Sequence, residues 1–123
     1  MIDGGHFSIA GRTKAFGYAF AGLAHVFKTA HAIWLQSAVA ACAIAVGFYL
    51  HISASDWRWI ALAVALVWTT EIMNTAVESV CDALHPEHHP MIGIAKDAAA
   101  GAVLMAGIGA VIIGTLTLWP YMF

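Results

Sequence analysis

The sequence predicts an all-α membrane protein, because its composition leaves too little charge to cover a water-soluble globule. Of the 123 residues, 62% are hydrophobic and only 10% are charged. A soluble domain is roughly half apolar and about a quarter charged. The chain also contains three long apolar segments, each near the length that a bilayer crossing requires. These observations exclude a cytosolic enzyme, a disordered tail and a small secreted domain. The net charge of −2 also offers no field that would attract nucleic acid.

Residues 12–30 are expected to form an amphipathic helix that lies on the membrane surface. The preceding segment, Met1–Ala10, lacks the uninterrupted apolar core of a secretion signal. One face of the helix is apolar and the opposite face is polar: Phe16, Phe20, Leu23 and Phe27 share the first, and Lys14, Tyr18, His25 and Lys28 share the second. Such a helix buries its apolar face at the acyl boundary of a membrane. A helix in a globular core is the alternative, but little soluble protein remains to pack on it.

We expect three membrane helices, at residues 33–50, 57–84 and 98–118, in one domain that covers residues 1–123. The second helix is longer than a single crossing requires. Its first half is apolar, whereas its second half carries carboxylates.

The placement of lysine and arginine predicts the orientation of these helices. Four of the five basic residues lie before the first span or between the second and third: Arg12, Lys14, Lys28 and Lys96. Basic residues near the ends of membrane helices mark the cytoplasmic side. The N-terminus, the second loop and the acidic half of the second span are therefore expected to face the cytoplasm.

The acidic residues are concentrated in one stretch, because five of the seven lie between Glu71 and Asp97. On a helix, Glu71, Asn74, Glu78 and Asp82 share one face. Ionisable side chains inside a membrane helix are costly and generally mark a functional site. Such a row of oxygens is typical of a Mg²⁺ site, or one buried carboxylate takes a proton from a substrate hydroxyl. Alternatively, Glu78 and Asp82 are simply the solvated end of an over-long helix.

Two more polar elements follow this acidic face. The loop from His85 to Pro90 carries three histidines and a glutamate, which suggests a transition-metal site, although the spacing matches no closed zinc site. Lys96 and Asp97 stand directly before the third expected span. There, a cation beside the positive end of a helix dipole would bind a phosphate. A lysine reaching toward water beside a helix-capping aspartate is an equally good interpretation.

Together these residues resemble the signature of the small prokaryotic integral-membrane lipid kinases, the diacylglycerol kinases and undecaprenol kinases. The segment Glu71–Glu78, Asp82, His89 and the segment Ala95–Leu104 carry the resemblance, which covers nearly the whole chain. It implies a homotrimer in the bacterial inner membrane, with one surface helix and three membrane helices per subunit. It also implies active sites that face the cytoplasm between subunits, a lipid alcohol as substrate, ATP as co-substrate and Mg²⁺ as cofactor.

The resemblance also implies a role for each matching residue. Glu71 corresponds to the general base that takes the proton from the lipid hydroxyl, and Glu78 corresponds to a Mg²⁺ ligand. The nucleotide-binding positions correspond to Tyr18, Asn74, Glu78, Asp82, Lys96 and Asp97, with Lys96 on the phosphates. Ala99 and Ala100 correspond, with Glu71, to positions at the lipid substrate. Phosphoryl transfer needs such an arrangement of metal and cations around the phosphates beside a positioned nucleophile.

The chain departs from the family at one position. The family usually has a glutamate just before the first span that helps to bind Mg²⁺, and this chain has Ala30 there, with Gln36 where another acid stands in some members. We expect other groups to complete the metal site, such as His31 with water, because the acidic face of the second span is intact.

Two questions stay open on the sequence. The segments Asn74–Ala76, His89–Pro90 and Ala99–Ala102 are more similar to the undecaprenol kinases than to the diacylglycerol kinases, yet both substrates present a primary alcohol. A small proton-coupled exporter would also use Glu71, but exporters of this size usually have four spans. A catalytically weakened, lipid-binding relative is the third interpretation, prompted by Ala30.

Overall fold

The computed structural model describes residues 8–85 and 87–123, and these residues form four α-helices. The helices are α1 (Ile9–Thr29), α2 (His31–Leu50), α3 (Ala54–Leu84) and α4 (Pro90–Met122). The last three are long and apolar enough to cross a membrane, so the predicted all-α class with three segments of spanning length is confirmed. The expectation of no secretion signal falls mainly on residues 1–7, which lie outside the described residues.

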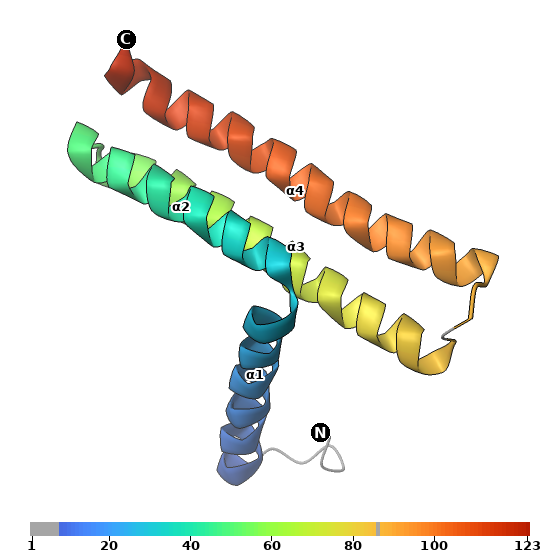
Figure 1. The fold of residues 1–123 in the computed structure, drawn as a ribbon. Helices are drawn as coiled ribbons and strands as arrows, with labels where there is room; N and C mark the ends of the chain where they lie inside the picture. The colour runs from blue at the N-terminus through green and yellow to red at the C-terminus, as the bar shows by residue number, and fades with distance from the viewer. Residues whose placement is uncertain (1–7, 86) are drawn as a thin grey trace.

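Helix α1 stands at a steep angle to the other three helices (Figure 1). It begins three residues before the expected start, because the Ser8 hydroxyl accepts a hydrogen bond from Gly11 N at 2.9 Å and caps the helix. Phe16 and Phe20 of the apolar face are 66% and 68% exposed. Their exposure is compatible with a face that meets lipid, and the surface location of α1 stays a prediction.

The joint between α1 and α2 is a single extended residue, Ala30. An aromatic cluster holds it in place. The Trp34 indole donates a hydrogen bond to the Phe27 carbonyl at 2.7 Å, and the Phe27 ring meets the edges of Trp34 and Trp68 at centroid distances of 5.6 and 6.0 Å. Since Trp68 belongs to α3, the cluster fixes the joint beside the middle of that helix.

A tight turn connects α2 to α3. His51 ends α2 in the left-handed region, at φ 53°, and Ile52 N donates to the Gly47 carbonyl at 3.3 Å. A Cβ on Gly47 would lie 2.7 Å from a carbon of the Trp57 ring. Glycine at this position therefore permits the close approach of α2 and α3.

The most extensive helix contact is between α3 and α4, which run antiparallel beside each other (Figure 1). Ala106 is buried in this contact, at 4% exposed. With 31 residues α3 is about 46 Å long, whereas α2 with 20 residues is about 30 Å, close to the thickness of the hydrocarbon core. The second half of α3 and the first half of α4 therefore extend beyond α2, and this is the half that carries the acidic residues.

Helix α4 begins eight residues before the expected span 98–118. Pro90 occupies the first turn, where its missing N–H costs nothing, and the His89 side chain accepts a hydrogen bond from Met91 N at 3.1 Å. Lys96 and Asp97 consequently lie inside the helix. The expectation that they stand at a helix N-terminus is wrong, and the helix dipole does not supply their positive field.

A polar clasp of three residues ties the end of α4 to the start of α3. The Tyr121 hydroxyl donates to the Asp56 carboxylate and accepts from Ser53 N at 3.2 Å. Ser53 also caps α3, because its hydroxyl accepts from Asp56 N. The clasp lies at the opposite end of the α3–α4 pair from the acidic residues.

Candidate active site

A polar pocket of about 540 Å³ lies where the α1–α2 joint meets the middle of α3 and the facing part of α4. The acidic face of α3 forms one wall with Glu71, Asn74, Glu78 and Asp82, as their helical spacing predicts. Ala100 and Val103 of α4 contribute to another wall, and the joint contributes the rest. The pocket therefore combines side chains from all four helices.

Glu71 is the buried carboxylate of this pocket, at 5% exposed. Its Oε2 accepts a hydrogen bond from Gln36 Nε2 of α2 at 3.4 Å, and Trp68 lies one turn before it on α3. Within residues 8–85 and 87–123 no lysine, arginine or histidine forms an ion pair with it. A carboxylate held in this way is a suitable acceptor for a proton from an uncharged substrate.

Asn74 and Glu78 form the next turn of the acidic face. Asn74 Nδ2 donates to Glu78 Oε1 at 3.3 Å, so the two side chains are held together. Asn74 Oδ1 is buried and lacks a hydrogen-bond partner among the described residues. Leaving a buried oxygen without a hydrogen bond costs free energy. Such an oxygen beside a carboxylate can bind a cation or accept a hydrogen bond from a ligand.

Asp82 and Lys96 form an ion pair across α3 and α4, with 2.7 Å between Oδ1 and Nζ. Their side chains are 65% and 38% exposed, so the pair is accessible to water. The hydrogen bond to Asp82 raises the pKa of Lys96, so Lys96 stays charged, but water screens an exposed pair of this kind and it adds little to stability. Lys96 is thus available to an incoming anion at the rim of the polar pocket.

The sequence analysis did not assign His25 and Thr29 to the pocket, and it interpreted Ala30 and His31 only as possible parts of a metal site. His25 and Thr29, from the last two turns of α1, line the pocket together with Ala30 and His31. The sequence assigned His25 to the polar face of a surface helix and mentioned His31 only as a substitute ligand. The signal that could have found them is the short distance along the chain between the joint at Ala30 and both histidines.

Other residues that the resemblance associated with substrates do not line the pocket. Tyr18 lies on the exposed part of α1, about three turns away from the joint. Asp97 is exposed on α4, and Ala99 is half-buried there, whereas its neighbour Ala100 does line the pocket. Their predicted roles are therefore neither supported nor contradicted by this cavity.

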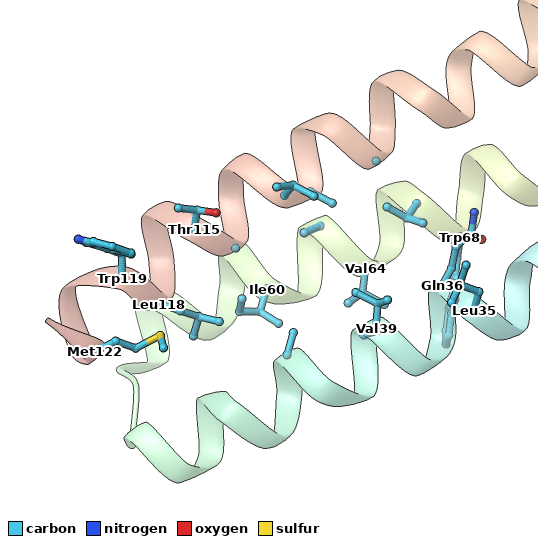
Figure 2. A pocket seen from close by; sticks show the side chains of 18 residues that line it. Leu35, Gln36, Val39, Ile60, Val64, Trp68, Thr115, Leu118, Trp119 and Met122 are labelled. Atoms are coloured by element: carbon cyan, nitrogen blue, oxygen red, sulfur yellow. The ribbon is translucent and has the colours of Figure 1, made fainter.

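An apolar groove of about 640 Å³ runs along α2, α3 and α4 (Figure 2). Gln36 and Trp68 lie at one end of the groove, and Trp119 and Met122 lie at the other. Its walls between these ends are almost entirely aliphatic or formed by small residues. The groove is thus an apolar space whose one polar end residue, Gln36, is hydrogen-bonded to the buried carboxylate of Glu71.

The donor set of the polar pocket suits Mg²⁺ better than a transition metal. Within residues 8–85 and 87–123, no three His, Cys, Asp or Glu side chains gather closely enough to hold a metal ion by themselves. Glu78 and the unpaired Oδ1 of Asn74 are instead neighbouring oxygens. Mg²⁺ is commonly held by one or two carboxylates together with substrate phosphates and water, so these residues fit it in the presence of a nucleotide.

The loop histidines have local roles where they are described. His85 Nδ1 lies 2.8 Å from the Glu87 carbonyl, and the His85 and His89 rings are 5.2 Å apart. His88 is exposed, and His89 caps α4. His85 and His89 thus have contacts within the loop and at the start of α4 that need no metal ion.

Comparison with known proteins establishes the family. A model of the prokaryotic diacylglycerol kinase family matches residues 17–118. The chain belongs to this family. It is 39% identical over 107 residues to a diacylglycerol kinase of Synechocystis sp., a match that covers 86% of this chain and 61% of that protein.

Two further relatives match over most of both chains. An undecaprenol kinase of Bacillus subtilis is 34% identical, with 87% of each chain covered, and a diacylglycerol kinase of Escherichia coli is 33% identical, with 88% of each covered. The resemblance to the membrane lipid kinases is thereby confirmed. Membership of this family and the three apolar helices together identify the chain as a membrane protein of the lipid-kinase type.

Proposed function

We propose that this protein transfers the γ-phosphate of ATP to the primary hydroxyl of a membrane lipid, with Mg²⁺ as cofactor. The product is phosphatidic acid if the lipid is diacylglycerol and undecaprenyl phosphate if it is undecaprenol. The observation that carries the proposal is the position of Glu71, a buried carboxylate that lines the polar pocket and is hydrogen-bonded to Gln36 of the apolar groove. A kinase that joins a water-soluble nucleotide to a lipid needs these two environments in contact.

Glu71 is the proposed general base. The lipid oxygen forms a bond to the γ-phosphorus while the bond from that phosphorus to the bridging oxygen of ATP breaks, and ADP leaves. The hydroxyl proton passes to the Glu71 carboxylate, which Gln36 holds from the side of α2. Catalysis of this type relies on positioning and on a base within reach of the hydroxyl.

The acidic face and Lys96 are the proposed phosphate-binding part. Glu78, with Asn74 and Asp82, would hold Mg²⁺, which supplies positive charge to the phosphate oxygens when bound. Lys96 leaves its exposed pair with Asp82 and contacts the phosphates directly. Tyr18 and Asp97 are proposed to bind the nucleotide from outside the pocket, and Ala99 and Ala100 to contact the lipid.

The proposed setting is a homotrimer in the bacterial inner membrane, with the polar pocket facing the cytoplasm. Support for this orientation comes from the basic residues before α2 and from Lys96 near the pocket. The homotrimer itself is proposed from membership of the family.

The two competing interpretations are less well supported. A small exporter was expected to have four spans, and residues 8–85 and 87–123 contain three helices of spanning length. A catalytically weakened relative remains the alternative, because Ala30 replaces an acidic residue on the pocket wall.

The direct test is phosphate transfer from ATP in mixed micelles, with diacylglycerol and undecaprenol offered separately. We expect Mg²⁺-dependent transfer to at least one of them. Replacing Glu71 by glutamine keeps the shape but removes the base, so the rate should fall by about 10²–10⁴-fold. Glu78→Gln should also abolish transfer, because the remaining oxygens bind Mg²⁺ too weakly.

Cys42→Ala is the matched control, since Cys42 is exposed on α2 and lines neither cavity. It should retain the wild-type rate. Wild-type protein that is inactive with both lipids, beside an active relative in the same assay, would refute the kinase proposal and favour the weakened relative.

A further inference from the structure

Two histidines, His25 of α1 and His31 of α2, line the polar pocket from the helices that meet at Ala30 (Figure 1). Both residues are exposed, so a ligand in the pocket can reach their rings. Neither imidazole makes a hydrogen bond or an ion pair with another described residue, although the acidic face of α3 lines the same pocket. The pocket therefore holds imidazoles and carboxylates that are not paired with each other.

These two imidazoles are the only side chains lining the pocket that carry a hydrogen-bond donor and make no hydrogen bond within the described part of the chain. The hydroxyls of Thr29, Thr75 and Ser79 each donate to the backbone carbonyl four residues earlier. The Asn74 amide donates to Glu78. A ligand rich in acceptor oxygens would therefore find free donors in this pocket at the two imidazoles.

The wall that carries the imidazoles has no negative charge of its own. Helix α1 contains no aspartate or glutamate, and neither does the first turn of α2. Ala30, between them, stands where the family resemblance leads us to expect an acid. Phosphate oxygens are negatively charged acceptors, so they are attracted by N–H donors and repelled by carboxylates that hold no metal. This wall suits a phosphate directly, whereas the acidic face of α3 suits one only through a cation.

We propose that His25 and His31 bind the terminal phosphates of the nucleotide, each donating an imidazole N–H to a phosphate oxygen. The terminal phosphates are the part concerned, because Glu71 lines the same pocket and the γ-phosphate must lie beside the hydroxyl that this base deprotonates. Both histidines contact substrate, and neither forms a covalent bond or takes up the hydroxyl proton. This inference rests on the proposed function and names side chains that recognise the phosphate donor.

A role as metal ligands fits these histidines less well. Mg²⁺ prefers oxygen ligands, and imidazole nitrogen suits transition metals instead. Within residues 8–85 and 87–123, no three His, Cys, Asp or Glu side chains gather closely enough to hold such a metal. The expectation that His31 completes the Mg²⁺ site is the competing interpretation, and the experiment below separates the two.

The test measures equilibrium binding of β,γ-methylene ATP, which cannot transfer its phosphate, to the protein in micelles at saturating Mg²⁺. In His31→Leu the Kd should rise about tenfold, the loss expected for one hydrogen bond to a charged group. His31→Gln keeps an N–H donor and should retain most of the affinity. His25→Leu should behave as His31→Leu does, and the double variant should lose about a hundredfold if the two bonds are independent.

AMP and the lipid substrate provide controls on the same variants. AMP lacks the terminal phosphates, so its Kd should not change in His31→Leu. The KM for the lipid alcohol and the Mg²⁺ concentration for half-maximal transfer should also stay at their wild-type values. Lys28→Gln is the matched control for charge, because Lys28 is exposed on the last turn of α1 and does not line the pocket. It should leave the Kd of the analogue unchanged.

Four outcomes would overturn the inference. If His31→Leu weakens AMP as much as the analogue, the histidine supports only the shape of the pocket. If Lys28→Gln weakens the analogue equally, the effect is one of general charge. If His31→Leu raises the Mg²⁺ requirement while the Kd at saturating Mg²⁺ is unchanged, His31 is a metal ligand. If both histidine variants bind the analogue as wild-type protein does, the phosphates lie elsewhere.

Failure of the proposed function would give a different result. Wild-type protein that binds the analogue through His25 and His31 but transfers phosphate to neither lipid would refute the kinase activity and support the phosphate contact. An active kinase whose affinity for the analogue is indifferent to both histidines would refute only the contact.

Discussion

At the scale of single residues, Ala30 stands where the family resemblance leads us to expect a glutamate that helps to bind Mg²⁺. It is the extended residue between α1 and α2, and it forms part of the wall of the polar pocket. An added carboxylate there would join Glu78 and the unpaired Asn74 oxygen on the same cavity. Ala30 therefore tests whether the acidic face of α3 is sufficient for the metal.

We predict that Ala30→Glu lowers the Mg²⁺ concentration needed for half-maximal phosphate transfer but is not required for turnover. Carboxylate oxygens are favoured Mg²⁺ ligands, so a further one strengthens the site. The measurement is a Mg²⁺ titration of the transfer rate in wild-type protein and variant, with Ala30→Gln as the uncharged control of similar size. A wild-type protein that becomes active only as Ala30→Glu would contradict the prediction.

Residue-scale reasoning from the sequence was most successful on α3. The positions of Glu71, Asn74, Glu78 and Asp82 on one face follow from helical periodicity alone, and all four line one pocket. The partners of this face could not be predicted in the same way. Gln36 and His25 come from other helices: Gln36 reaches Glu71 because α2 packs beside α3, and His25 reaches the pocket because one non-helical residue, Ala30, turns the chain between α1 and α2.

At the scale of elements, the close approach of α2 and α3 depends on Gly47. A methyl group at this position would lie 2.7 Å from the Trp57 ring and 3.2 Å from the Ile52 side chain. Ile52 is buried and Trp57 packs on Phe48 with 4.8 Å between ring centroids, so these packed side chains would have to shift to admit the methyl group. The turn between the two helices has no room for a larger residue.

We predict that Gly47→Ala destabilises the protein by about 1–3 kcal/mol, the usual cost of overpacking a close contact. Thermal unfolding in detergent, followed by circular dichroism, measures the effect. Gly22→Ala on α1 is the control, since nothing lies within 4 Å of the added carbon there, and alanine favours a helix. Equal melting temperatures for wild-type protein and Gly47→Ala would show that the turn adapts.

The element boundaries were predicted unevenly, for physical reasons. The C-terminal end of α3 at Leu84 agrees with the sequence, because charged and turn-forming residues follow the apolar run. The start of α4 does not agree, because hydropathy begins to rise at Ala98, whereas the backbone becomes helical at Pro90. Proline at a first helical turn was the overlooked signal, and it places Lys96 beside Asp82 instead of at a helix end.

At the scale of the whole molecule, an odd number of membrane crossings would place the two ends of the chain on opposite sides of the membrane. From the basic residues before α2 we predict that the N-terminal side faces the cytoplasm. The polar pocket and the loop after Leu84 would then face the cytoplasm as well, and the clasp at Tyr121 would face outward.

We predict that a phosphatase that is active only outside the cytoplasm will be active when fused after Phe123. The same reporter fused at the N-terminus should be inactive. A fluorescent protein that folds only in the cytoplasm should give the reverse pattern. An N-terminal and a C-terminal reporter on the same side would require an even number of spans and would revive the exporter interpretation.

The clasp of Ser53, Asp56 and Tyr121 has a mechanical consequence. Together with the loop after Leu84, it closes α3 and α4 into a ring that is fastened at both ends, so neither helix can slip past the other by a turn without unfastening one end. The contact between Lys96 and Asp82 is therefore held in register from the opposite end of the helix pair. Helix α1, by contrast, is joined to the rest of the fold through one extended residue and one aromatic cluster.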